Sequence, residues 1–257
     1  MKIEAVVTCV DYADFLAETM PHNRSLFDKL VVVTAPEDQA TQRICEYWHV
    51  DCVRTDEFRT RWGEFRKGAA INDGLARLDC TDWLVHMDAD IVLPPLARTL
   101  LESAALDPSF IYGVDRHMVQ GYAPWRQFMT LPALQQENGI FVHTNPFPIG
   151  VRVTPRIHGG WLPIGFFQMW NAVSGRLRYP DTHLDAGRTD MQFAAQWPRN
   201  RRALIPEIVA YHLESEPGAP MGVNWNGRRT RAFGSDSAAY GEEAPGARLN
   251  RSDTTGR

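Results

Sequence analysis

The chain has 257 residues, 44% of them hydrophobic, and a formal net charge of -4 at neutral pH. This length suits one sizeable α/β domain or two small ones. The negative charge argues against a protein that coats nucleic acid through bulk electrostatics. The sequence has no run of eighteen apolar residues and no charged leader before an apolar core, so we expect a cytoplasmic protein without a membrane span.

Short apolar runs alternate with helical patterns over the first part of the chain. The pattern predicts strands at 3–10, 29–34, 50–54 and from 83, and helices after Asp14, after Pro36 and over about 64–78. Such alternation is typical of a parallel wound sheet flanked by helices, so we predict an α/β fold. No Gly-x-Gly-x-x-Gly follows the first run and no P-loop pattern occurs, which argues against dehydrogenases and kinases.

The second half is less regular. The pattern predicts a helix from Pro95 to about Asp107, strands at 109–114, 165–171 and 203–213, and the start of a helix at Thr189 or Asp190. The aromatic-rich stretch from Arg116 to about Pro148 lacks periodicity, which is typical of functional loops but also fits a surface excursion that packs on itself. We predict one domain over 1–234 and a flexible tail over 235–257, where apolar residues are scarce.

The most informative stretch runs from Trp83 to Pro95 and ends its apolar part in two carboxylates, Asp88 and Asp90. Side chains alternate along a strand, so the two carboxylates share one side, with the small Ala89 between them. No arginine or lysine stands in the motif to relieve their repulsion. A divalent cation would do so, since magnesium-type ions are held by one or two carboxylates. The alternative is an acidic turn that caps the helix after Pro95.

Asp88-Ala89-Asp90 resembles the Asp-x-Asp motif of family-2-like GT-A-fold glycosyltransferases, and Lys67 to Gly74 resembles the Lys/Arg-x-x-x-x-Asn-x-Gly helix that precedes it there. The resemblance implies a GT-A-type, Rossmann-like fold, with a mostly parallel wound sheet flanked by helices. It further implies a nucleotide-sugar-binding half over about 1–115 and an acceptor-binding half over 116–234. The resemblance also implies Mn²⁺ or Mg²⁺ as the protein's cofactor and a nucleoside-diphosphate sugar as its donor substrate.

The resemblance also suggests residues for the donor. These are Thr8, Asp11 and Asp38 for the base and ribose, and Lys67, Asn72 and Asp88 elsewhere on the donor. Helix capping and loop solvation remain the alternative reading of the first three. Lys67, Arg116 or Arg188 could add positive charge at the phosphates, and the sequence does not choose among them.

Two further roles rest on the resemblance. Asp88, Asp90 and His212 would hold the metal, although a lone histidine such as His212 is more often structural. Asp190 matches the carboxylate at the head of a helix that deprotonates the acceptor. Thr189 stands where the family often has a second acid, which is a departure from its pattern.

These features predict an enzyme that transfers a sugar from a nucleoside-diphosphate sugar to a hydroxyl acceptor, with inversion at the sugar carbon. Alternatives are a retaining glycosyltransferase, a nucleotidyltransferase acting on sugar phosphates, and a binding protein that has lost catalysis. A nucleotidyltransferase would normally carry a glycine-rich basic loop after its first strand, which this chain lacks. A saccharide, a small molecule, a protein and a modified DNA base all remain open as the acceptor.

Overall fold

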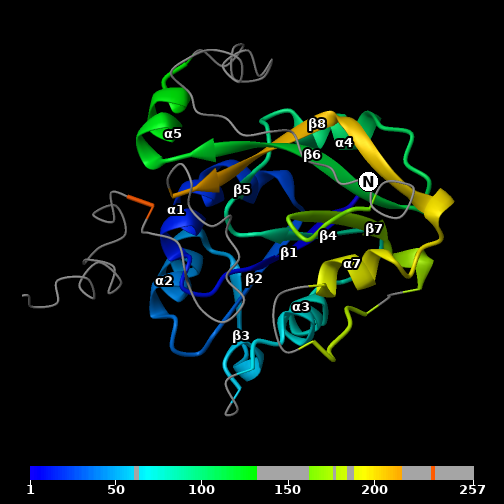
Figure 1. Cartoon of the computed structure of the whole chain (residues 1–257), viewed down its shortest axis with the longest axis horizontal. Coiled ribbons are helices and arrows are strands. Elements are labelled where there is room, and N and C mark those ends of the chain that lie inside the picture. The colour runs from blue at the N-terminus through cyan, green and yellow to red at the C-terminus, as the bar shows by residue number, and fades with distance from the viewer. Residues whose placement is uncertain (61–63, 132–161, 176–177, 184–187, 216–232, 235–257) are drawn as a thin grey trace, which may run out of the picture.

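The computed structural model describes residues 1–60, 64–131, 162–175, 178–183, 188–215 and 233–234. Their strands form one sheet in the order β3-β2-β1-β4-β7-β6-β8-β5 (Figure 1). The strands are β1 Ile3–Thr8, β2 Lys29–Thr34, β3 Asp51–Arg54, β4 Trp83–Asp88, β5 Ile91–Val92, β6 Ile111–Gln120, β7 Phe167–Asn171 and β8 Arg202–Glu214. The helices are α1 Ala13–Asn23, α2 Gln39–Trp48, α3 Lys67–Leu75, α4 Ala97–Ser103, α5 Tyr122–Met129 and α7 Thr189–Ala194.

The predicted α/β fold is confirmed. β3, β2, β1 and β4 run parallel, and in chain order β1, β2, β3 and β4 are connected by α1, α2 and α3, as the alternating pattern indicated. β7 enters antiparallel between β4 and β6, and the short β5 pairs antiparallel with β8. β6 and β8 are again parallel, so the sheet is mixed. Within the described part of the chain, no helix has both the length and the apolar character needed to cross a bilayer.

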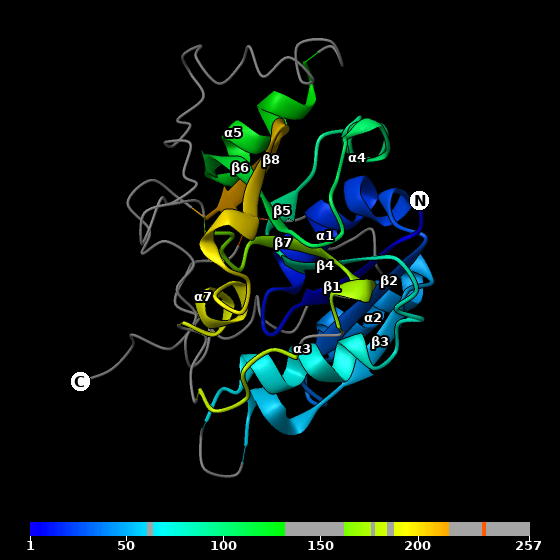
Figure 2. The same cartoon turned by 90° about the vertical axis from the view of Figure 1, so that its right-hand side faces the viewer.

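Side chains that alternate along the parallel strands pack into two hydrophobic cores, one on each face of the sheet. In β1, for example, Ala5 and Val7 belong to one core and Val6 to the other, as expected for an extended chain. α1, α2, α4 and α5 cover the first core, and α3 and α7 cover the second. Figure 2 shows α3 and α7 together on the side of the sheet away from α1 and α4.

The structure corrects the prediction of irregular chain after Arg116. β6 continues to Gln120 and α5 follows directly, so the chain is regular as far as Met129. Local periodicity does not reveal this, because β6 takes its backbone partners from β8, about ninety residues later. Residues 132–161, which include the rest of the predicted loop, lie outside the described residues. The predicted helices at 64–78 and 95–107 are shorter, as α3 and α4.

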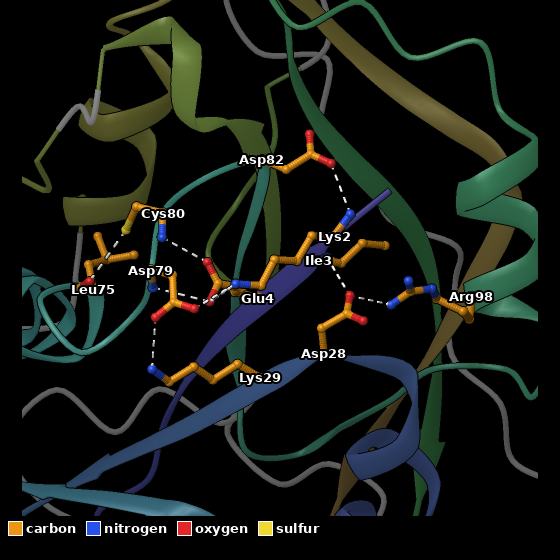
Figure 3. Close-up of polar contacts among 10 residues, drawn as sticks. All are labelled: Lys2, Ile3, Glu4, Asp28, Lys29, Leu75, Asp79, Cys80, Asp82 and Arg98. Atoms are coloured by element: carbon orange, nitrogen blue, oxygen red, sulfur yellow. Dashed lines mark hydrogen bonds and ion pairs between the residues drawn. The ribbon is translucent and has the colours of Figure 1, made fainter.

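The amino-terminal edge of the sheet is closed by polar contacts that leave its carboxylates well paired (Figure 3). The buried Glu4 accepts hydrogen bonds from the backbone N–H groups of Asp79 and Cys80, at 3.1 and 2.8 Å. Asp28 accepts one from the N–H of Ile3 at 2.7 Å and pairs with Arg98 at 2.8 Å. These groups satisfy one another, so this edge offers little for a ligand to bind.

The Asp28 contacts make a pH-dependent contribution to stability. The N–H of Ile3 and then Arg98 lower the pKa of Asp28, so its stabilisation is present above the unfolded pKa of about 3.9 and is lost as pH falls through the lower folded pKa. We expect Asp28→Asn to unfold more readily than wild type at pH 7, with a difference that shrinks toward pH 2. Urea denaturation across this pH range measures it; a difference independent of pH would contradict the assignment.

Candidate active site

The candidate residues gather at the opposite edge, where β1 and β4 end. Thr8 and Asp88 are the last residues of these strands and are register partners. The Thr8 hydroxyl oxygen lies 3.4 Å from Nε2 of His86. His86 is fully buried and precedes Asp88 by two residues on β4. Burial is the main cause that lowers the pKa of His86 well below its usual value, with Lys67 adding to it. The carboxyl end of a parallel strand pair is where α/β sheets commonly bind ligands.

Lys67, the first residue of α3, lies against Asp88. Its Nζ is 2.6 Å from Asp88 Oδ1, so the carboxylate has a basic partner that the motif itself does not contain. The start of α3 is fixed by close packing, because a Cβ on Gly68 would lie 1.9 Å from the backbone oxygen of Pro180. Burial disfavours the charged ammonium, but Asp88, Asp190 and Asp90 together outweigh it and raise the pKa of Lys67. Asp88 therefore contacts this ammonium group, and Asp90 and the distant Asp190 act on it electrostatically.

Asp88 and Asp90 differ in their electrostatic surroundings. Burial raises the pKa of Asp88, although Lys67 opposes the shift. For Asp90 burial acts in the same direction, but His212 outweighs it and the pKa is lowered. Asp90 Oδ2 lies 3.2 Å from His212 Nε2. β8 places His212 beside Asp90, because His212 pairs with Ile91 in the sheet. The backbone N–H of the next residue, Leu213, donates to the Asp90 carbonyl oxygen at 2.9 Å.

Asp190 lies in the first turn of α7, beside Gly165. The Gly165 N–H donates to Asp190 Oδ2 at 2.6 Å, and a Cβ on Gly165 would come within 3.0 Å of the same carboxylate oxygen. Gln168 Nε2 donates to the backbone oxygen of Asp190 at 2.9 Å. β7 and the chain before it thus hold Asp190 where its charge acts on Lys67. The predicted placement at the start of a helix agrees with the structure, while its catalytic role stays a prediction.

Asp38 and Asp11 form a second group, after β2 and β1. Asp38 caps α2: Oδ1 accepts from the Thr41 N–H at 3.1 Å, and Oδ2 accepts from the Thr41 hydroxyl at 2.7 Å and the Asp11 N–H at 2.9 Å. Its carboxylate is thereby used within the fold. Asp11 has φ of 58° and an ion pair with Arg59, which also lies 3.2 Å from Glu37. Burial raises the pKa of Asp11 against the effect of Arg59. Asp38 therefore positions Asp11, whose side chain is half-exposed.

Asn72 lies inside the fold. Its amide donates to the Tyr179 carbonyl oxygen at 3.0 Å and accepts from the Tyr179 N–H at 2.9 Å, so both of its functions hold this segment. The Tyr179 hydroxyl in turn donates to Gln168 Oε1 at 2.5 Å. Burial, with Asp190 and Asp88, raises the pKa of Tyr179 well above its usual range, which keeps this hydroxyl a donor. Asn72 thus supports the wall of the site, and a donor contact by it stays a prediction.

The predicted metal ligands can be tested against the donors that the fold leaves open. Asp90 Oδ1 and His212 Nε2 are buried, and no described residue completes a hydrogen bond to either. His212 Nε2 lies 3.2 Å from the other oxygen of this carboxylate, Asp90 Oδ2, close to the ~3.0 Å that separates two adjacent octahedral ligands at ~2.1 Å. Asp88 is paired with Lys67, and the described residues contain no preformed group of three His, Cys, Asp or Glu side chains. The spacing of Asp90 and His212 therefore suits a cation, while Asp88 would have to leave Lys67.

Some residues around the site had no signal in the sequence. Gln168, Tyr179 and Arg59 are positioned by contacts with distant segments, and no local sequence pattern marks them.

Arg116 was one of three candidates for positive charge, and the structure places it against His212, at 2.6 Å between Nη1 and Nδ1. Arg188 has φ of 66° and precedes α7.

No family model matches the chain, and no curated protein sequence matches it. Among solved structures, it is similar to glucosyl-3-phosphoglycerate synthase from Mycobacterium tuberculosis in complex with Mn²⁺, uridine-diphosphate-glucose and phosphoglyceric acid, with a TM-score of 0.52, 14% identity, and coverage of 86% of this chain and 74% of that one. It also matches mannosyl-3-phosphoglycerate synthase from Rubrobacter xylanophilus, with a TM-score of 0.46, 15% identity, and coverage of 84% and 67%. The chain has a GT-A-type glycosyltransferase fold. At this identity the likeness establishes the fold alone.

Proposed function

We propose that the chain is a metal-dependent glycosyltransferase that moves a sugar from a nucleoside-diphosphate sugar to a hydroxyl acceptor with inversion. The observation that carries the proposal is the pairing of Asp88 with the Lys67 ammonium at the strand ends of this fold, where Asp90 and Asp190 also act on the ammonium electrostatically. Clustered carboxylates are expensive to bury, and perturbed pKa values, here raised for Asp88 and lowered for Asp90, are typical of active sites. Residues 1–115 would bind the donor and 116–234 the acceptor.

On the donor side, Asp90 and His212 would hold Mn²⁺ or Mg²⁺, joined by Asp88. When bound, the cation would neutralise charge that develops on the leaving diphosphate. Lys67, freed from Asp88, would supply a further positive charge at the same place. The exposed part of Asp11, at the end of the loop that Asp38 holds, is the candidate for contact with the nucleoside.

On the acceptor side, Asp190 would take the proton of the attacking hydroxyl. The Gly165 N–H fixes Oδ2 of its carboxylate, so the acceptor would approach Oδ1. The Lys67 ammonium lies near enough to act on this carboxylate electrostatically. One hydrogen bond and one nearby charge fix the orientation of this carboxylate, and proton transfer in the transition state requires a base in a fixed orientation.

A donor panel tests the reaction class. Purified protein is incubated with several nucleotide sugars, beginning with UDP-glucose, in Mn²⁺, Mg²⁺ or EDTA, and release of the nucleoside diphosphate is followed. Acceptors of each open class are then added, beginning with phosphoglyceric acid, and the anomeric configuration of the product distinguishes inversion from retention. We expect metal-dependent release with at least one donor. Release of pyrophosphate from a sugar phosphate and a nucleoside triphosphate would instead support a nucleotidyltransferase.

Asp90→Asn should weaken binding of the nucleoside diphosphate in Mn²⁺ by about 100-fold or more. Even residues that only support metal ligands commonly contribute 10- to 100-fold to affinity, and Asp90 would be a direct ligand. Isothermal titration calorimetry with and without EDTA measures the effect. Asp79→Asn, at the opposite edge of the sheet, is the matched control and should bind as wild type does. Equal affinity of the wild type in Mn²⁺ and in EDTA would contradict the metal-dependent proposal.

A further inference from the structure

Arg116 is a buried arginine whose guanidinium contacts His212. In the register of β6 and β8, Arg116 pairs with Ala210, two residues before His212, so both side chains leave the same face of the sheet. Arg116 is 6% and His212 7% exposed. The guanidinium carbon also lies 4.5 Å from the centroid of the Phe166 ring, and this ring stacks with the His212 ring at 6.5 Å. The guanidinium is thus held on two sides.

This contact decides which nitrogen of His212 carries the proton. A guanidinium only donates hydrogen bonds, so His212 Nδ1, 2.6 Å from Arg116 Nη1, must accept. In a neutral imidazole the other nitrogen then bears the hydrogen. That nitrogen, Nε2, faces Asp90 Oδ2 at 3.2 Å. His212 therefore presents an N–H group, and not a lone pair, to the candidate cation site.

We propose that Arg116 is a positioning residue that holds His212 in the Nε2–H tautomer, and that a divalent cation can bind His212 only by breaking the Arg116 hydrogen bond. The second half of the proposal rests on the proposed function, in which Asp90 and His212 hold the cation. A metal-bound nitrogen must offer its lone pair, so the proton moves from Nε2 to Nδ1 with no net gain or loss. Metal-bound histidines donate that second N–H to an acceptor, and Arg116 has none.

The charges around Arg116 allow such a displacement. Asp90, Asp88, Glu214 and Asp115 all act on the guanidinium electrostatically. Glu214 is 2% exposed and lies two residues after His212 on β8, on the same face of the strand. A guanidinium that leaves His212 therefore stays among carboxylates, and its buried charge is not left without compensation. Arg116 thus sets how readily the site accepts a cation.

The tautomer can be read directly in the metal-free protein. Long-range ¹H–¹⁵N spectra of ¹⁵N-histidine-labelled protein are recorded at about pH 8.5, two units above the usual imidazole pKa of about 6.5. His212 is assigned from the signal lost in His212→Gln. We expect wild type and Arg116→Lys to show the proton on Nε2, because an ammonium also only donates. Arg116→Gln should lose this preference, because its amide can also accept. A proton on Nδ1 of His212 in wild type would overturn the proposal, whatever the Arg116 variants show.

Titration with Zn²⁺, a diamagnetic probe, tests the displacement on the same spectra. In wild type we expect the proton to move to Nδ1, and in Arg116→Gln we expect binding about 10- to 100-fold tighter, the value of a charge-assisted hydrogen bond. Tighter binding with an unchanged tautomer would show that only the charge of Arg116 matters, and would overturn the positioning role. If Zn²⁺ leaves His212 unchanged in all proteins, the displacement is wrong, whereas donor binding measured by calorimetry decides the proposed transferase separately.

Discussion

Asp190→Asn should lower turnover about 100- to 10,000-fold, the usual loss when a well-placed general base is removed. Asparagine keeps the shape of the side chain and can still accept the Gly165 hydrogen bond, which measures 2.6 Å in the wild type. It cannot take a proton from an acceptor hydroxyl. Donor and cation affinity should stay within about twofold, because the loss would fall on the transition state alone. Initial rates at saturating donor, with calorimetry of donor binding, measure the two effects separately.

The loss of charge beside Lys67 needs its own control. Asp190 is one of three carboxylates acting on that ammonium, so its removal also changes the local field. Asp181→Asn removes an exposed carboxylate from the neighbouring segment 178–183 and should leave turnover near the wild-type rate. If Asp190→Asn transfers sugar at the wild-type rate, Asp190 serves only to hold Gly165. A collapse in Asp181→Asn instead would move the base to that residue.

The elements that were predictable from sequence are those that local periodicity decides. β2 spans the predicted residues 29–34, and β4 delivers Asp88 to its carboxyl end, because a continuous apolar run in a parallel sheet needs no partner information to be recognised. The helix predicted after Pro36 begins at Gln39. For Asp38 the sequence allowed either nucleoside contact or capping, and the structure shows the cap.

The contacts that define the site could not be read in this way, because they join distant residues. Lys67 reaches Asp88 across 21 positions, Arg116 reaches His212 across 96 and Asn72 reaches Tyr179 across 107. Each depends on the register of strands or on the packing of α3, which side-chain patterns do not fix. The motif correctly drew attention to two carboxylates without a basic neighbour in the chain. Their partners, Lys67 and His212, come from α3 and β8, elsewhere in the fold.

Phe233→Ala should destabilise the chain by about 3–5 kcal/mol, the usual cost of truncating a buried aromatic side chain. Phe233 is fully buried, stacks on Phe15 at 4.7 Å and meets the edge of Tyr122 at 5.3 Å. Its N–H donates to Asp14 at 2.6 Å, and the segment lies beside α1 in Figure 1. With about 2–4 °C per kcal/mol for a chain of this size, the melting temperature should fall by roughly 6–20 °C.

Two shortened chains separate this anchor from the residues that follow it. A chain of residues 1–234 keeps Phe233 and should melt within about 1–2 °C of the full chain, because the removed residues carry little apolar pattern. A chain of residues 1–232 lacks Phe233 and should melt at least as low as Phe233→Ala. Differential scanning calorimetry compares all four proteins. A large loss already at 1–234 would show that the predicted tail packs, and the proposed domain boundary would then have to move beyond Gly234.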